Sequence, residues 1–217
     1  MAAGAAACLL DAYDTIVHTD FSAHRGELPA LAGIPADALW GEFRHLGAAL
    51  STGQLSMTEA FARTLRACGA EPRPGLAREL ADRSRELLLA SARLYDDVLP
   101  FLRSLRARGV RTAVVSNCDE NTRPLLETLG VAAVTDALVL SFEVGAVKPA
   151  APIFVAALNR LGVAAGAAVF VDNIAAYCAG AAALGIRAVQ MVRDDGHGDV
   201  TSDFKVVRSL GDVEALL

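Results

Sequence analysis

The chain lacks the close cysteine pairs that mark zinc sites and dithiol redox motifs. Its four cysteines are spread along the sequence, at Cys8, Cys68, Cys118 and Cys178. We expect reduced and mostly buried thiols, because an isolated cysteine behaves as a small hydrophobic residue. The histidines show no metal-ligand spacing either and are expected in loops or at the surface. They are His18, His24, His45 and His197.

Basic stripes and long apolar runs are missing as well. The basic residues are scattered and the net charge is -5, which argues against a nucleic-acid groove because such a groove needs a concentrated positive face. No apolar run approaches the length that crosses a membrane. The apolar start of the chain has no basic segment, and Asp11 interrupts it too early for a secretory signal peptide. We expect a cytoplasmic protein, a monomer or homodimer, without nucleic-acid or membrane partners.

Aromatic residues are few, at 6%, but 53% of the 217 residues are hydrophobic, which is ample for a core of small and aliphatic side chains. Short apolar runs alternate with helical patterns, which is typical of a parallel α/β sheet. The predicted strands are Ala6–Leu10, Thr112–Val115, Ala137–Leu140, Ala168–Val171 and Ala188–Met191. Polar residues follow four of them, and Ser141-Phe142-Glu143 is predicted to end the third. Ligands bind at the carboxyl ends of such strands, so chemistry is expected there.

About a hundred residues separate the first two predicted strands, far more than a single crossover helix requires. This stretch has helical patterns at 36–50, 56–67 and 74–92, and Ser56 with Glu59 predicts a capping box at the start of the second. A further helix is expected at 96–108. We therefore predict an α/β fold with a three-layer parallel-sheet core, residues 1–18 and 94–217, and an inserted all-helical domain over 19–93.

The polar residues at the strand ends form a chemically coherent set. Asp11 is a candidate nucleophile, provided that an electrophile is held and charge-neutralised beside it. Ser116, Asn117 and Lys148 offer a hydroxyl, an amide and an ammonium that can bind an anionic group and stabilise charge in a transition state. Asp172 can complete a Mg²⁺ site with Asp11, because Mg²⁺ prefers oxygen ligands.

Four segments around these residues resemble the motifs of the haloacid dehalogenase-like hydrolases, in that family's order and spacing. They are LLDAYDTI at Leu9–Ile16, VVSN at Val114–Asn117, VKP at Val147–Pro149 and VFVDN at Val169–Asn173, the last followed by the glycine- and alanine-rich Ala179–Gly185. The resemblance extends from Leu9 to the C-terminus and implies a Rossmann-like core, with Thr19–Arg93 similar to the family's helical cap.

The resemblance also implies a role for each motif. Asp11 would attack the substrate and form a covalent intermediate that water then opens. The residues implied to bind the transferring group are Thr15, Ser116, Asn117 and Lys148; of these, Ser116 and Lys148 are also counted as catalytic. In a phosphatase of the family, Asp11, Asp172 and the backbone carbonyl of Tyr13 would hold Mg²⁺.

Tyr13 departs from the phosphatase pattern, which has an aspartate there to protonate the leaving group and activate water. A phenol with a pKa near ~10 cannot act as that base at neutral pH, and losing a general acid–base costs ~10²–10⁴ in rate. Asp11-Ala12-Tyr13 instead resembles the metal-independent 2-haloacid dehalogenases, whose halide leaves without a proton. Arg44, in the predicted cap, could then bind a halide or carboxylate.

The fourth motif favours the phosphatase, because Asp172 stands where the dehalogenases have a small polar residue. Asp14 stands where the first motif of the family usually has a glycine. It is either a displaced acid–base group or a turn residue, and we favour the turn because aspartate tolerates left-handed backbone. We therefore expect a Mg²⁺-dependent phosphatase, slowed by Tyr13, of a small phosphorylated metabolite. A metal-independent 2-haloacid dehalogenase and a catalytically degraded binding or regulatory protein are the alternatives.

Overall fold

The structure, a computed structural model, describes residues 5–70, 73–193 and 203–217. Its centre is a six-stranded sheet in the order β5-β4-β1-β6-β7-β8, and all its neighbouring strands are parallel. The strands are β1 (Ala7–Leu10), β4 (Arg111–Ser116), β5 (Ala137–Leu140), β6 (Ala168–Asp172), β7 (Arg187–Met191) and β8 (Lys205–Val207). The first five confirm the predicted strands to within one residue at each end. The three-residue β8 was not predicted, because so short a run carries no periodicity.

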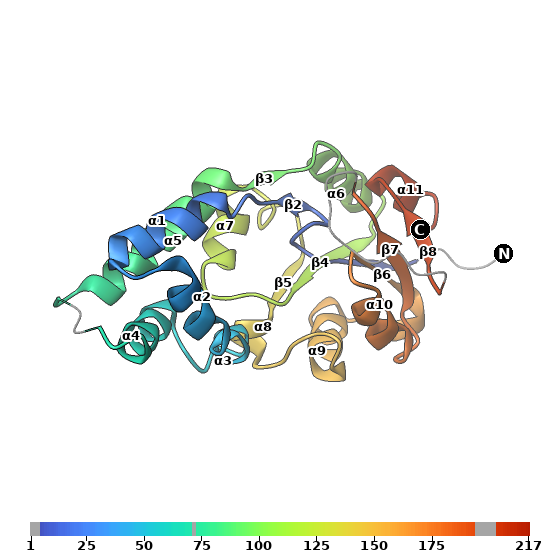
Figure 1. Cartoon of the computed structure of the whole chain (residues 1–217). Coiled ribbons are helices and arrows are strands. Elements are labelled where there is room, and N and C mark those ends of the chain that lie inside the picture. The colour runs from blue at the N-terminus through green and yellow to red at the C-terminus, as the bar shows by residue number, and fades with distance from the viewer. Residues whose placement is uncertain (1–4, 71–72, 194–202) are drawn as a thin grey trace.

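Helices cover both faces of this sheet, so the core has the three layers that were predicted (Figure 1). The helices around the sheet are α6 (Val98–Ala107), α7 (Thr122–Thr128), α8 (Ser141–Val144), α9 (Ala151–Leu161), α10 (Ala175–Ala182) and α11 (Leu210–Glu214). Successive residues of a strand point to opposite faces. In β1, Cys8 and Leu10 accordingly pack in the cluster with α6, α7 and α11, whereas Ala7 and Leu9 pack in the cluster with α9 and α10.

Five helices lie between β1 and β4 and form a hydrophobic cluster of their own. They are α1 (Ser22–Ala32), α2 (Ala36–Arg44), α3 (Gly47–Ser51), α4 (Met57–Ala67) and α5 (Leu76–Ser91); we call them the helical segment. The chain enters through β2 (Val17–His18) and returns through β3 (Arg93–Leu94), which pair antiparallel. The predicted boundaries at 18/19 and 93/94 fall in this ribbon, and the division into core and cap stays a prediction.

Local predictions in the helical segment were partly right. Ser56 begins α4 with the predicted capping box: its Oγ accepts from the Glu59 backbone N–H at 3.2 Å, and the Glu59 carboxylate accepts from the Ser56 backbone N–H at 2.8 Å. The single helix predicted over 36–50 was wrong, because the chain turns after Arg44 and resumes as α3 at Gly47. None of the described helices is both long and apolar enough to span a membrane.

Two further expectations need correction. Ser141-Phe142-Glu143, predicted to end the third strand, begin the short helix α8 instead. His24, expected in a loop or at the surface, is buried in α1, where its Nε2 lies 2.9 Å from the Ser84 carbonyl oxygen. His45 is exposed as expected, whereas His197 lies outside the described residues.

Candidate active site

The carboxyl ends of β1 and β6 bring two acidic side chains together. Leu10 pairs with Val171 in the register of the two strands, and the Asp11 backbone N–H donates to the Val171 carbonyl at 2.9 Å. Asp11 therefore follows β1 at the level where Asp172 ends β6. The two carboxylates are close because of the strand order and register, so their proximity could be predicted from their places at the ends of strands.

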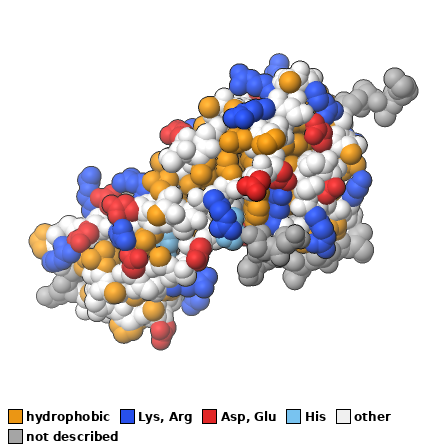
Figure 2. Space-filling model, turned by 90° about the horizontal axis from the view of Figure 1, so that it is seen from above, with side chains coloured by type: hydrophobic (Ala, Val, Ile, Leu, Met, Phe, Trp, Pro, Cys, Tyr) orange, Lys and Arg blue, Asp and Glu red, His pale blue; other side chains and the backbone are white. Residues whose placement is uncertain are grey.

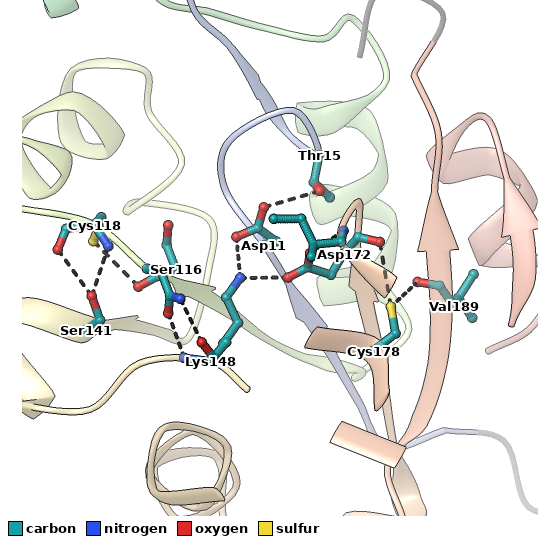
Figure 3. Close-up of polar contacts among 11 residues, drawn as sticks. Asp11, Thr15, Ser116, Cys118, Ser141, Lys148, Asp172, Cys178 and Val189 are labelled. Atoms are coloured by element: carbon teal, nitrogen blue, oxygen red, sulfur yellow. Dashed lines mark hydrogen bonds and ion pairs between the residues drawn. The ribbon is translucent and has the colours of Figure 1, made fainter. Parts of the chain in front are cut away.

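Lys148 lies between these two carboxylates (Figure 3). Its Nζ is 2.5 Å from Asp11 Oδ1 and 2.6 Å from Asp172 Oδ2. The exposed fractions of the three side chains are 0% for Lys148, 9% for Asp11 and 0% for Asp172. Two carboxylates thus share one ammonium away from water, in a group that we call the charged cluster. When all three groups are ionised, the cluster carries one uncompensated negative charge.

The pKa values of the cluster show this imbalance. Burial, followed by the charge of Asp11, raises the pKa of Asp172 to about 7, although Lys148 acts in the opposite direction. Burial alone would lower the pKa of Lys148, but the charges of Asp11 and Asp172 outweigh it and the pKa is raised. Lys148 therefore stays protonated at neutral pH, and a further cation at the cluster would relieve the repulsion between the carboxylates.

Asn117 holds the backbone of Lys148. Its Nδ2 donates to the Lys148 carbonyl at 2.9 Å, and its Oδ1 accepts from the Lys148 backbone N–H at 2.7 Å. Both ends of the amide thus position Lys148, and its predicted binding of the transferring group stays a prediction. Gly180 of α10 supports the same segment, because a Cβ there would lie 2.4 Å from the Pro149 carbonyl oxygen. The small residue is thus needed for a close approach to Pro149.

The two predicted hydroxyl groups have different surroundings. Thr15 is fully buried, and its Oγ1 donates to Asp11 Oδ2 over a long 3.4 Å. Ser116 ends β4 and is fully buried, and its Oγ has no hydrogen-bond partner among the residues that the structure describes. A buried hydroxyl left unpaired costs about 1–3 kcal/mol. A substrate oxygen at this place would satisfy Ser116, as expected of a residue that binds a transferring group.

The loop after Asp11 contains a left-handed turn at Asp14. Asp14 has a φ of 56°, in the left-handed region, and its backbone N–H donates to the Val17 carbonyl at 2.8 Å. This conformation is the turn that we favoured for Asp14. The Tyr13 hydroxyl lies 2.9 Å from Thr122 Oγ1, and burial, followed by the charge of Asp119, raises the pKa of Tyr13 above its usual value. The phenol therefore stays protonated and cannot act as a base.

Arg193, which the sequence analysis missed, holds the same loop from the other side. Its Nε and Nη2 donate to the Thr15 carbonyl at 3.0 and 2.9 Å, and its guanidinium binds both carboxylate oxygens of Asp97 at 2.8 and 2.9 Å. It also stacks 4.2 Å from the ring centroid of Tyr95. This contact could not be predicted from the sequence, because Arg193 is 178 residues from Thr15 and belongs to no motif.

A cavity of about 700 Å³ lies between the helical segment and the loops beside the charged cluster. The two parts appear as a smaller and a larger lobe in the space-filling view (Figure 2). The core side of the cavity includes Tyr13, Asn117, Cys118, Asp119 and Thr122. The predicted Arg44 also lines this cavity, from the helical segment, whereas Asp11, Ser116 and Lys148 are not among its lining residues.

Comparison with known proteins agrees with this geometry. Residues 5–185 match the model of the haloacid dehalogenase-like hydrolases, and the chain belongs to this family of hydrolases. A phosphatase of Mycobacterium tuberculosis, MT3486, is 27% identical over 97% of this chain and 96% of its own length. A ribulose-1,5-bisphosphate 5-phosphatase of Halopiger xanaduensis is 35% identical over 59% of this chain, which spans about half (55%) of that relative. A crystal structure of a 2-haloacid dehalogenase from Pseudomonas syringae superimposes with a TM-score of 0.73 over 96% of both chains, at 23% identity.

Proposed function

We propose that this hydrolase is a Mg²⁺-dependent phosphatase of a small anionic metabolite, with Asp11 as the nucleophile. The observation that carries the proposal is the sharing of Lys148 by Asp11 and Asp172. Displacement of a halide requires only one carboxylate, and a second buried one is costly unless a cation compensates for it. Two relatives that are named phosphatases support the same choice.

The residues present fit a magnesium ion. No group of three or more His, Cys, Asp or Glu side chains that could hold a metal ion occurs within the described ranges, so side chains alone would not complete the coordination of an ion here. Mg²⁺ usually takes one or two carboxylates and fills its other positions with water and substrate oxygens. Asp11 and Asp172, with the backbone carbonyl of Tyr13, would be its protein ligands. The ion would supply positive charge for the oxygens of the phosphoryl group.

The chain's own residues then divide the reaction between them. A carboxylate oxygen of Asp11 attacks phosphorus, the bond from phosphorus to the leaving oxygen breaks, and that oxygen takes a proton from solvent water, because no carboxylic acid stands at Tyr13. The Ser116 hydroxyl donates to a phosphoryl oxygen while Lys148 compensates its charge. Water then attacks phosphorus of the aspartyl phosphate and gives its proton to the solvent, the bond to Asp11 breaks, and inorganic phosphate leaves with Asp11 restored as a carboxylate. Because Tyr13 cannot remove a proton from that water, we expect the second step to be slow.

Asp11→Asn tests the proposal directly. We expect hydrolysis of a panel of phosphate monoesters to depend on Mg²⁺ and to fall by at least ~10³-fold in the variant, the order of loss that follows removal of a nucleophile. Asp37→Asn, at an exposed position of α2, is the matched control and should retain full activity. Rates that are unchanged by EDTA would refute the magnesium-dependent phosphatase. A complete lack of turnover would instead favour the degraded binding or regulatory protein.

A metal-independent 2-haloacid dehalogenase is the second candidate, and Tyr13 is the observation that favours it. Its protonated, hydrogen-bonded phenol cannot serve as a base, and a departing halide needs no proton. Incubation with 2-chloropropionate in EDTA, followed by chloride detection, separates the candidates. Chloride release that Asp11→Asn abolishes, without release of phosphate from any ester, would establish the dehalogenase.

A further inference from the structure

The wall that the helical segment gives to the cavity is aromatic. Phe21, Trp40, Phe43 and Phe61 line it, which is four of the nine phenylalanine and tryptophan side chains in a chain otherwise poor in them. The ring centroids of Trp40 and Phe43 are 5.6 Å apart, and those of Phe43 and Phe61 are 4.9 Å apart. Such a wall favours an apolar ring, because burial of aromatic surface is favourable and ring pairs add to it.

Two arginines accompany these rings. Arg25 and Arg44 both line the cavity and are exposed, and neither has an ion-pair partner among the residues that the structure describes. Two arginines of α5 do have such partners, Arg83 with Glu27 and Arg85 with Asp82. The guanidinium groups at the cavity are therefore available to an anion, and a carboxylate matches their planar donor geometry.

The core loops give the cavity further polar residues, in addition to His24, Ser51 and Ser84 of the helical segment. Asn117, which binds the Lys148 backbone, lines the cavity together with Tyr13, Asp119 and Thr122. A polyhydroxylated substrate would leave hydroxyl groups against Phe43 and its neighbours without hydrogen-bond partners, which is unfavourable. The volume of about 700 Å³ is typical of pockets that bind ring-containing small molecules.

We infer that the substrate is a phosphate monoester whose alcohol part contains an aromatic or similarly bulky apolar group and ends in a second anionic group bound by Arg25 and Arg44. The aromatic wall and the two available arginines, opposite the polar core loops, carry this inference. It rests on the proposed function for the phosphoryl end and deepens it by defining the class of alcohol.

Trp40, the single tryptophan of the chain, allows a binding test that needs no turnover. Its fluorescence is titrated in the intact, metal-free protein with three phosphonates: 2-phenylethylphosphonate, the same compound with a para carboxylate, and 3,4-dihydroxybutylphosphonate. We expect the phenyl compound to bind at least ~10-fold more tightly than the diol, and the carboxylate to add about another 10-fold, as one charge-assisted hydrogen bond can.

Variants identify the contacts. Arg25→Gln and Arg44→Gln should remove most of the carboxylate's gain and leave the phenyl preference, whereas Arg63→Gln, an exposed position of α4 outside the cavity, should change neither. Phe43→Ala should reduce the phenyl preference, and Phe43→Leu should retain part of it. Equal affinity for the diol and phenyl compounds would overturn the inference, as would a carboxylate gain that survives the Arg25→Gln, Arg44→Gln double variant.

Hydrolysis separates this inference from the proposed function. Turnover of 2-phenylethyl phosphate with a kcat/KM well above that of glycerol 3-phosphate supports both. Equal kcat/KM values for the two esters leave the phosphatase intact and refute the apolar substrate class. If neither ester is hydrolysed but the phenyl phosphonates still bind at Trp40 with the expected order, the phosphatase fails and the ligand class stands.

Discussion

The charged cluster and the aromatic wall face the same region of the molecule, but they are built in different ways. The cluster consists of residues at the ends of β1 and β6 together with Lys148, all fixed by the sheet and its connecting loops. The wall consists of side chains on helices that pack among themselves in a separate hydrophobic cluster. The reacting end of the site therefore depends on the sheet, whereas the substrate end depends on packing within the helical segment.

Lys148→Met removes the cation of the charged cluster, and we expect it to have the largest effect. The variant leaves two carboxylates buried without their cation, which typically costs about 3–5 kcal/mol. We expect the free energy of unfolding, measured in urea, to fall by that order, and phosphatase activity to disappear. The double variant Lys148→Met, Asp172→Asn should regain part of the stability. No regain would mean that the loss comes from packing rather than charge.

Gly180→Ala tests whether the Lys148 segment depends on the close approach of α10. The added methyl group would lie 2.4 Å from the Pro149 carbonyl oxygen, and such overpacking costs about 1–3 kcal/mol. We expect a lower unfolding midpoint and a reduced kcat, because Lys148 must shift. Gly166→Ala, with no atom within 4 Å of the added carbon, is the control. Equal stability of the two variants would show that α10 moves away at little cost.

Arg193→Met tests whether Arg193 positions the loop that carries Asp14 and Thr15. Loss of the guanidinium leaves the Thr15 carbonyl without its Arg193 donors and Asp97 with the Leu210 backbone N–H in place of its ion pair, and we expect a loss of roughly 1–3 kcal/mol in stability. Since Arg193 acts on the loop and not on substrate, kcat should fall more than KM rises. Arg187→Gln, exposed on β7, should change neither value. A change in KM alone would contradict a positioning role.

The charged cluster could be predicted from the sequence far better than the aromatic wall. Asp11, Ser116 and Asp172 could be predicted to meet because each follows or ends an apolar strand, and parallel strands place their carboxyl ends at one edge. The amide of Asn117 could be linked to this edge, but not to the Lys148 backbone, because that contact depends on how the loop between β5 and α9 folds.

The helical segment was predictable as helical, but not as a cavity wall. Periodicity identifies which face of a helix is apolar and places Trp40 beside Phe43 within α2. Phe43 contacts Phe61, however, only because α2 and α4 pack together. Arg44 was assigned to the substrate from its position in the cap, and the cavity contains it together with the unpredicted Arg25. Arg193 had no local signal, since Thr15 and Asp97 are far from it in sequence.

We expect the smallest effect from His24, whose titration tests how the stability of the helical segment depends on pH. Burial lowers its pKa below the usual 6.5, although the hydrogen bond to Ser84 and the charge of Glu27 oppose this. The unfolded state therefore binds the proton more readily, so the free energy of unfolding should decrease as the pH falls through 6.5 toward the folded-state pKa. Urea titrations between pH 7.5 and 5.5 should show a smaller decrease in His24→Gln than in wild type. The exposed His45→Gln should behave as wild type, and if His24→Gln does so too, acid does not act on the helical segment through His24.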